Sequence, residues 1–397
     1  MKKYQAIAMA LSALSAGLLI SCAKPNNDTA NQNATSKEAR PQQANPQETG
    51  NEANHEEVST QSQDAAANNS KATEVSSISA EAQSAYLTHV AKDIVIPAYH
   101  DAVKQSEMLN TLAKKHCATG AVQGEPLLEL RGQWIKLAQA WAAAEMINFG
   151  PATQSMSNLY INYYPDERGL VHNGVAELIA SNPNLTPEQL AQQSAVVQGV
   201  PGLEEALFAQ DSLKTPQCNY VISASSALNT RLMAIEKQWQ DTSVALLAID
   251  KTAESDQGLN QWVNSLLSFI ETMKSTAIDQ PLGLTGNKKG HLPADSAGQS
   301  RAIINAKLAT LNKVLTDPVL TAMLQANPDG NAVGDKLLTA LSQAATLLAQ
   351  MPNDIGQADK ATQQKLLNHL TSITQIIKRE LIPALGVRVG FNSTDGD

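Results

Sequence analysis

One short stretch of the chain combines a carboxylate with the residues that could hold it in place. It spans residues 198–208 and reads QGVPGLEEALF. Gly199 permits a close backbone approach, and Pro201 suits the first position of a helix, where no amide donor is needed. Glu204 and Glu205 would then lie in the first turn, near the positive end of the helix dipole. We therefore expect Glu204 at the buried mouth of a short helix, as a metal ligand or simply as a carboxylate that begins the helix.

Four of the seven histidines are candidate partners for such a carboxylate. His89 lies four residues before Asp93, a spacing that places the two side chains on one face of a helix. A solvated pair at this spacing is commoner than a pair of metal ligands. The four candidates come from separate segments, so a metal site built from them with Glu204 is an alternative rather than the expectation. They are His89, His100, His172 and His291.

The elements that must position these residues are predicted to be helices. Apolar residues recur every three or four positions, and no stretch shows the sustained alternation that is typical of a strand. Aromatic residues make up only 4% of the chain. The pattern predicts an all-α fold. The clearest apolar stripes lie in residues 224–239, 262–273, 337–351 and 366–381.

Two long helices should precede the Glu204 stretch. The first is expected from about residue 78 to residue 117, with a kink at Pro97, because proline removes a backbone donor. The second is expected over residues 127–149 and ends at Gly150 and Pro151. In the second half of the chain, residues 279–299 form an irregular insert. Such an insert is long for an idle connection, and long loops often carry function.

The start of the chain has the composition of an export signal followed by a tether. Residues 1–21 join two lysines to an apolar run that is too short to span a membrane. The run ends at Cys22, in a context that resembles a lipoprotein signal whose cysteine is lipidated; the alternative is an ordinary secretory signal. Residues 22–80 are too polar to bury a core, so we expect a disordered tether. Loss of the signal would move the net charge from −9 to −11.

The remaining residues are enough for two domains, which we place at residues 81–250 and 251–397. Both are expected to be helical bundles. With Cys22 set aside for lipid, Cys117 and Cys218 are the remaining cysteines. Export to an oxidising compartment favours a disulfide between them, and two buried free thiols are the alternative.

Several short motifs, taken together and in order, resemble the imelysin-like family. The likeness covers about residues 80–397, and it implies an all-helical fold of two bundle domains with an inter-domain cleft. The family is associated with bacterial iron uptake and was named for an insulin-cleaving metallopeptidase. The motifs are a lipobox, residues 97–99, 149–151 and 164–166, the central GVPGLE of residues 199–204, and a C-terminal GFNSTDGD at residues 390–397.

One departure from the family pattern bears on function. Metallopeptidase-type members resemble Gly-x-His-x-x-Glu, in which an imidazole and a carboxylate can both bind a metal. Here Pro201 stands at the histidine position, while Glu204 keeps the carboxylate. The resemblance places further cleft residues at Gly199, Ser296, Ser300, Phe391 and Asn392.

We therefore expect a non-enzymatic, lipid-anchored binding protein of the cell envelope, associated with iron uptake. Its anchor would place it at the outer membrane, facing the periplasm or the cell surface. Its ligand or partner could be iron or zinc, an iron complex or an envelope protein. The alternatives are an imelysin-type metallopeptidase and a structural, peptide-binding or glycan-binding envelope protein. The acidic net charge argues against nucleic acid, because phosphate binding requires a basic face.

Overall fold

The described part of the chain is built of helices, which confirms the predicted all-α fold. The computed structural model describes residues 78–246, 257–325 and 330–387, which belong to one compact unit. Two short strands, β1 (Val122–Gln123) and β2 (Ser212–Leu213), pair antiparallel. The α-helices are α1 (Ala80–His89), α2 (Ile96–Cys117), α3 (Glu125–Ala144), α4 (Ser157–Ile161), α5 (Leu170–Ser181), α6 (Pro187–Ala191), α7 (Gly199–Phe208), α8 (Thr215–Leu246), α9 (Gln257–Lys274), α10 (Gln280–Leu282), α11 (Ser300–Leu315), α12 (Pro318–Gln325), α13 (Gly330–Gln350), α14 (Lys360–Ile376) and α15 (Ile382–Ala384).

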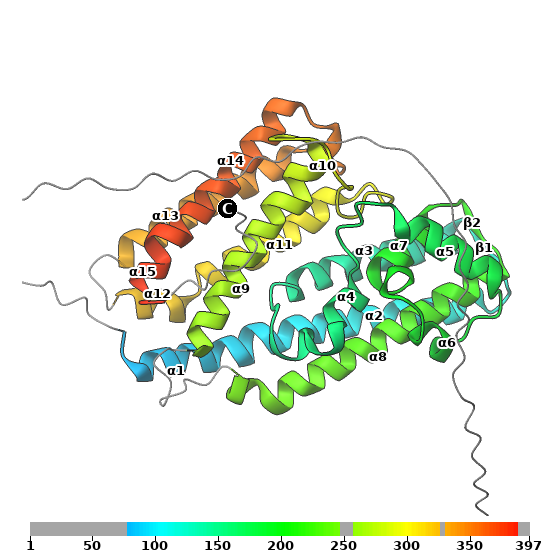
Figure 1. Ribbon diagram of the computed structural model, residues 1–397, viewed down its shortest axis with the longest axis horizontal. Coiled ribbons are helices and arrows are strands. Elements are labelled where there is room, and N and C mark those ends of the chain that lie inside the picture. Colours follow the sequence, from blue (N-terminus) through cyan, green and yellow to red (C-terminus); the bar gives the residue numbers. More distant parts are fainter. Residues whose placement is uncertain (1–77, 247–256, 326–329, 388–397) are drawn as a thin grey trace, which may run out of the picture. The chain divides into compact units, whose positions relative to one another are not determined.

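The helices pack along one another through their apolar stripes. Figure 1 shows α2 and α8 side by side, and α2 also packs on α3. The short helix α7 lies against both α3 and α8. On its other side, α3 contacts α11, which packs with α13, and α13 packs with α14. All four predicted stripes are buried; in α9, for example, Trp262, Leu266, Phe269 and Met273 are each no more than 6% exposed.

Three π-helical segments each come just before a proline. Val90–Val95 precedes Pro97, Ser275–Asp279 precedes Pro281, and Ile377–Leu381 precedes Pro383. A proline ring collides with the carbonyl four residues earlier in an α-helix, and the wider π turn relieves that contact. The first helix therefore runs as α1, a π-helical segment and α2, where a kink at Pro97 had been predicted. The irregular insert predicted from residue 279 begins later in the structure. The π-helical turn accommodates Pro281, so helical structure continues to Leu282.

Two further boundaries differ from the predicted ones. Helix α3 ends at Ala144 rather than at residue 149. Helix α7 begins at Gly199, so Pro201 is its third residue and not its first. Glu204 and Glu205 consequently lie in the second turn, and the prediction that they meet the helix dipole in the first turn is wrong.

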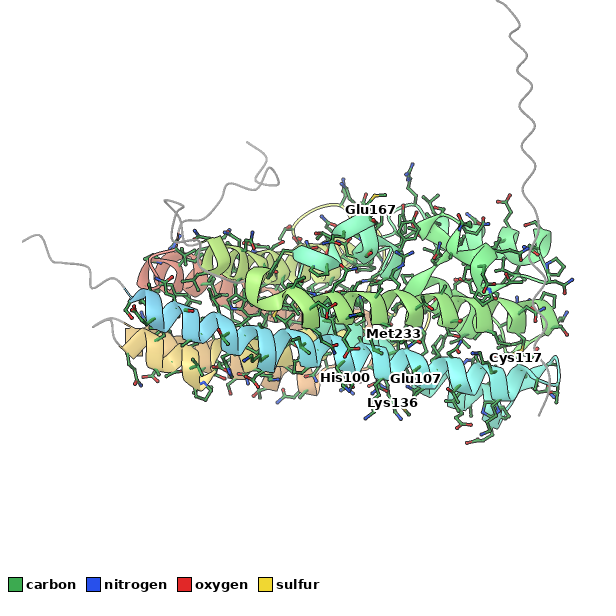
Figure 2. All side chains as sticks on the ribbon, turned by 90° about the horizontal axis from the view of Figure 1, so that it is seen from below. His100, Glu107, Cys117, Lys136, Glu167 and Met233 are labelled. Atoms are coloured by element: carbon green, nitrogen blue, oxygen red, sulfur yellow. A yellow bond between two sulfur atoms is a disulfide. The ribbon has the colours of Figure 1, made fainter. Side chains whose placement is uncertain are left out.

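A disulfide joins Cys117, the last residue of α2, to Cys218 near the start of α8, with a Cα–Cα distance of 5.4 Å. Figure 2 shows Cys117 at this end of α2. The predicted pairing is thus confirmed. In the described ranges, no helix is both long and apolar enough to cross a membrane.

Some predicted features fall outside the described residues. They are the signal, most of the tether, Cys22, Phe391 and Asn392. The predicted domain boundary near residue 250 also falls outside them, within residues 247–256. The division into two bundle domains therefore stays a prediction.

Candidate functional site

Helix α3 holds α7, the helix that carries Glu204, near both of its ends. Near the start of α7, the indole N–H of Trp134 donates to the carbonyl of Val200 at 3.0 Å. At the other end, the guanidinium of Arg131 donates to the carbonyls of Leu207 and Gln210, both at 2.7 Å. The last carbonyls of a helix lack intrahelical partners, so Arg131 satisfies groups that would otherwise be unpaired.

Two glycines allow α7 to lie close to its neighbours. Gly199 has a φ of +70°, and a Cβ there would collide with the carbonyl oxygen of Ile161 at the end of α4. A Cβ at Gly202 would collide with the hydroxyl of Tyr220, which donates to the carbonyl of Val197 at 2.9 Å. Larger side chains at either position would push α7 away from α4 or α8.

The Glu204 carboxylate is partly buried and meets the loop that precedes α11. Its Oε1 atom accepts a hydrogen bond from the backbone N–H of Ala297 at 3.1 Å. Burial raises the pKa of the Glu204 carboxyl to about 7, and the negative charges of Asp295 and Glu205 act in the same direction. The backbone N–H groups of Ala297 and Ser296 oppose this shift, because they favour the charged form.

A cavity of about 50 Å³ adjoins Glu204. Its wall includes Pro201 from α7, His291 and Pro293 from the loop, and Lys307 from α11. Most of the remaining wall is apolar and comes from α3, including Trp134 and Trp141. The space therefore combines two carboxylates, those of Glu204 and Glu145, with one imidazole and one amine within a largely apolar surround.

A second cavity, of about 190 Å³, shares part of this wall. It also carries the amide side chains of Asn148 and Asn158 and the hydroxyls of Ser268 and Thr272. The two cavities therefore form neighbouring chambers with a common partition. The residues that line both are Trp141, Glu145, Asn162, Tyr164 and Lys307.

A buried ion pair lies in this partition. The ammonium of Lys307 contacts Oε1 of Glu145, and Asn162 donates to Oε2 of the same carboxylate at 3.2 Å. The Lys307 nitrogen also lies 5.0 Å from the ring centroid of Phe269. Burial lowers the pKa of the Lys307 amine to about 7, whereas the adjacent Glu145 carboxylate favours the charged form. A polar ligand that entered either chamber would meet this pair.

Trp141, at 3% exposure, has an indole N–H without an acceptor among the described residues. It lines both chambers. A buried donor that is left unpaired costs free energy, and a ligand oxygen in the chamber would satisfy it.

His291 is fixed in one tautomer by its own loop. Its Nδ1 lies 3.0 Å from the carbonyl oxygen of Leu292; because a carbonyl only accepts, Nδ1 must carry the proton. The Tyr164 ring packs edge-on against the imidazole, with a centroid distance of 5.6 Å. The Tyr164 hydroxyl shares its one proton between the carbonyls of Thr276 and His291, at 3.0 and 2.9 Å. In the neutral imidazole, Nε2 keeps a lone pair for a ligand or a metal.

The predicted cleft residues are only partly brought together. Pro201 and Glu204 line the smaller cavity, and the backbone N–H of Ser296 acts on the Glu204 carboxylate. Gly199 lines neither chamber and lies against Ile161 of α4. The Ser300 hydroxyl is buried elsewhere, where it accepts from the backbone N–H of Ile355 at 2.9 Å. The break at residues 149–151 lines neither chamber: the ring of Phe149 packs on Trp239 instead.

The other candidate histidines are paired with carboxylates away from these chambers. The imidazole of His89 lies between Asp93 and Asp317, which raise its pKa. His100 donates to Glu236 and His172 to Glu205, each at 2.8 Å. Figure 2 shows His100 and Glu167 on opposite sides of the helices. Gly290, in the loop that carries His291, lies next to Glu167. Within the described ranges, no three His, Cys, Asp or Glu residues form a group that could hold a metal ion.

Several site residues were not identified from the sequence, Glu145, Asn162 and Trp141 among them, and Lys307 is the one that carries a recognisable signal. It lies on the apolar face of α11, between Ile303 and Ile304 on one side and Leu308 and Leu311 on the other. A lysine within an apolar stripe is the signal that could have identified it, since charged residues are seldom buried without a partner.

Comparisons with known proteins show which family and fold the chain resembles. Residues 95–379 match the family described as imelysin. An imelysin-like protein from Psychrobacter arcticum 273-4 is 70% identical with a TM-score of 0.77; the match covers 79% of this chain and 98% of that chain. A protein named as an iron-regulated protein A precursor, from Parabacteroides distasonis ATCC 8503, has a TM-score of 0.61 at 14% identity, over 76% of this chain and 95% of that one. No curated protein matches the chain.

Proposed function

The chain belongs to the imelysin family, and we propose that it is a non-enzymatic binding protein whose ligand site is the pair of chambers beside Glu204 and Lys307. The observation that carries this proposal is the set of ionisable and hydrogen-bonding groups gathered around these two adjoining cavities. Glu204 and Lys307 have pKa values shifted to about 7, and the Trp141 indole N–H lacks an acceptor among the described residues. Such perturbed groups in a cavity are typical of functional sites.

We infer further that the ligand is an iron complex. A carboxylate oxygen and an imidazole nitrogen are both iron ligands, and Glu204 and His291 line the same cavity. Two protein donors leave most of the coordination sphere to be filled by the ligand itself, so iron would arrive as cargo with its own donors. The relative named for iron regulation supports an association with iron in this family.

The protein would act in the cell envelope, anchored by lipid on Cys22. This part of the proposal rests on the sequence of residues 1–22. Cells expressing the full chain and fed labelled palmitate should yield a labelled protein in the membrane fraction. Cys22→Ser should lose the label and leave that fraction; a labelled Cys22→Ser variant would contradict the anchor.

The binding proposal is tested by metal retention in the purified mature chain. The chain is dialysed against iron(II) without oxygen, iron(III) with citrate, or zinc, and bound metal is measured by elemental analysis. We expect iron to be retained with citrate, and Glu204→Gln and His291→Ala each to lower retention. Glu177→Gln, an exposed glutamate on α5, is the matched control. Failure to retain iron, or equal retention by Glu204→Gln, would rule out the iron proposal.

The metallopeptidase remains the second candidate because of the family match. Pro201 cannot supply the nitrogen ligand that its position would otherwise provide. Incubation with insulin distinguishes the two functions. Cleavage that is blocked by a chelator and abolished in Glu204→Gln would replace the binding proposal with the enzymatic one.

A further inference from the structure

A separate groove lies along α8. It has a volume of about 440 Å³ and is formed where residues 151–157, helix α6 and helix α8 meet. Figure 1 shows α4 and α6 lying against α8, in agreement with their contacts. No residue that lines this groove lines either chamber beside Glu204.

The groove contains one partly buried cation, Arg231 on α8. Its guanidinium packs over the Tyr160 ring, 4.5 Å from the centroid. It makes no hydrogen bond or ion pair with any described residue, whereas Arg131 and Arg301 are both bonded to carbonyl groups. Burial lowers the pKa of the Arg231 guanidinium. A guanidinium withdrawn from water is stabilised by an anion, and its five donors match a carboxylate.

The charges in and around the groove favour a ligand with one negative charge over a ligand with several. Glu188 is the one acidic residue of its lining, and it is exposed. With a single guanidinium present and a net charge of −9 on the chain, a dianion such as phosphate would be repelled more than a monoanion.

The remaining wall contains both polar and apolar groups. Ser226 and Thr230 bring hydroxyls from α8, and Gln154 and Gln238 bring amides. Between them lie small apolar side chains such as Ala227 and Ala234. Ser155, also in the wall, has a φ of 51°, a conformation that non-glycine residues seldom adopt and that is often found at binding sites. Hydroxyls and amides suit the backbone of a bound peptide, and the apolar patches suit small side chains.

We propose that this groove binds the free carboxylate end of a short peptide with small side chains, through an ion pair between that carboxylate and Arg231. This inference is independent of the iron proposal. The two share no residue, so either can fail without affecting the other.

The test uses the purified mature chain with trialanine and with trialanine amide, which lacks the terminal carboxylate. Saturation-transfer NMR on the alanine methyl groups measures binding of each peptide. We expect trialanine to bind and its amide to bind at least about tenfold more weakly, since a charge-assisted bidentate pair is lost. Arg231→Gln should weaken trialanine binding by a similar factor, and Arg231→Lys, which keeps the charge but not the fork, by less.

Controls separate this site from general effects. Arg168→Gln removes an exposed arginine outside the groove and should bind trialanine as the unaltered chain does. Circular dichroism checks that each variant is folded. Absence of trialanine binding, equal binding of the two peptides, or unchanged binding in Arg231→Gln would overturn the proposal. Displacement of trialanine by inorganic phosphate at lower concentration than by acetate would instead indicate a phosphate site.

Discussion

The carboxylate of Glu204 accepts a hydrogen bond from the backbone N–H of Ala297 across 93 residues of sequence. This contact joins α7 to the loop that carries His291, so the wall of the smaller cavity depends on both segments. The loop is held at a second point by Tyr164, which donates to the carbonyl of His291. Whatever enters the cavity therefore meets a carboxylate whose position is set by backbone contacts.

Glu204→Gln should change how the stability of the protein depends on pH. The folded-state pKa of about 7 lies above the ordinary value of 4.5 for a glutamate, so the folded state binds this proton more tightly than the unfolded state. The protonated Glu204 carboxyl therefore stabilises the folded state fully below pH 4.5, and this contribution is lost as pH rises to about 7. A glutamine cannot lose a proton. The free energy of unfolding of the variant should therefore rise by up to about 3 kcal/mol, relative to that of the unaltered chain, between acid and neutral pH.

Urea unfolding at pH 5 and pH 8 measures this difference. Glu177→Gln serves as the control, because that side chain is exposed and should give the same difference from the unaltered chain at both pH values. A Glu204→Gln effect that does not vary with pH would mean that Glu204 is charged throughout this range.

Lys307→Met should destabilise the protein by about 3 to 5 kcal/mol, because it leaves the Glu145 carboxylate without its buried partner. The double variant Lys307→Met, Glu145→Gln should be more stable than Lys307→Met alone, since no unpaired charge remains. Urea unfolding of the two single variants and the double variant gives the coupling energy. If the double variant loses as much unfolding free energy as the two single variants together, the coupling energy is zero and the ion pair does not stabilise the protein.

Two glycine-to-alanine substitutions should have opposite signs. Gly199→Ala places a Cβ against the Ile161 carbonyl at a positive φ, and should cost more than about 2 kcal/mol. Gly132→Ala, in the middle of α3 with no atom within 4 Å of the new Cβ, should stabilise by up to about 1 kcal/mol. Thermal unfolding of both variants gives the sign of each stability change. A neutral Gly199→Ala would show that α7 can shift away from α4 at little cost.

The Cys117–Cys218 disulfide spans 101 residues. A crosslink over a loop of this length stabilises by about 4 to 5 kcal/mol in the chain-entropy account. The double variant Cys117→Ala, Cys218→Ala should therefore unfold at clearly lower urea concentration. A thiol assay on denatured, unreduced protein checks the bond directly, and two free thiols there would contradict it.

The helices could be predicted from the sequence because burial of an apolar stripe decides where they form. The stripe of α9, for instance, is visible as Trp262, Leu266, Phe269 and Met273, and all four are buried. The disulfide could be predicted because Cys117 and Cys218 are the two cysteines that remain once Cys22 is assigned to lipid. The first prediction depends on local spacing, and the second on the cysteine count and the expected oxidising compartment.

The candidate site could be predicted only in part, because its chemistry is assembled from distant segments. Lys307, Glu145 and Asn162 come from α11, from the end of α3 and from the residue after α4. Nothing in their local spacing indicates that they meet. The start of α7 was misplaced because Pro201 is tolerated at the third helical position as well as at the first, where its missing N–H is equally unneeded.

The π-helical turn before α2 also sets the rotational phase of the first long helix. Leu87, Ala91, Val95, Tyr99 and Val103 follow one another at intervals of four and are all buried. In an unbroken α-helix each interval of four overshoots a turn of 3.6 residues by about 40°, and such a row would drift around the helix toward solvent. The wide turn at Val90–Val95 absorbs part of that drift. Deletion of one residue from this turn would rotate α1 by about 100° relative to α2 and carry Leu87 out of the core.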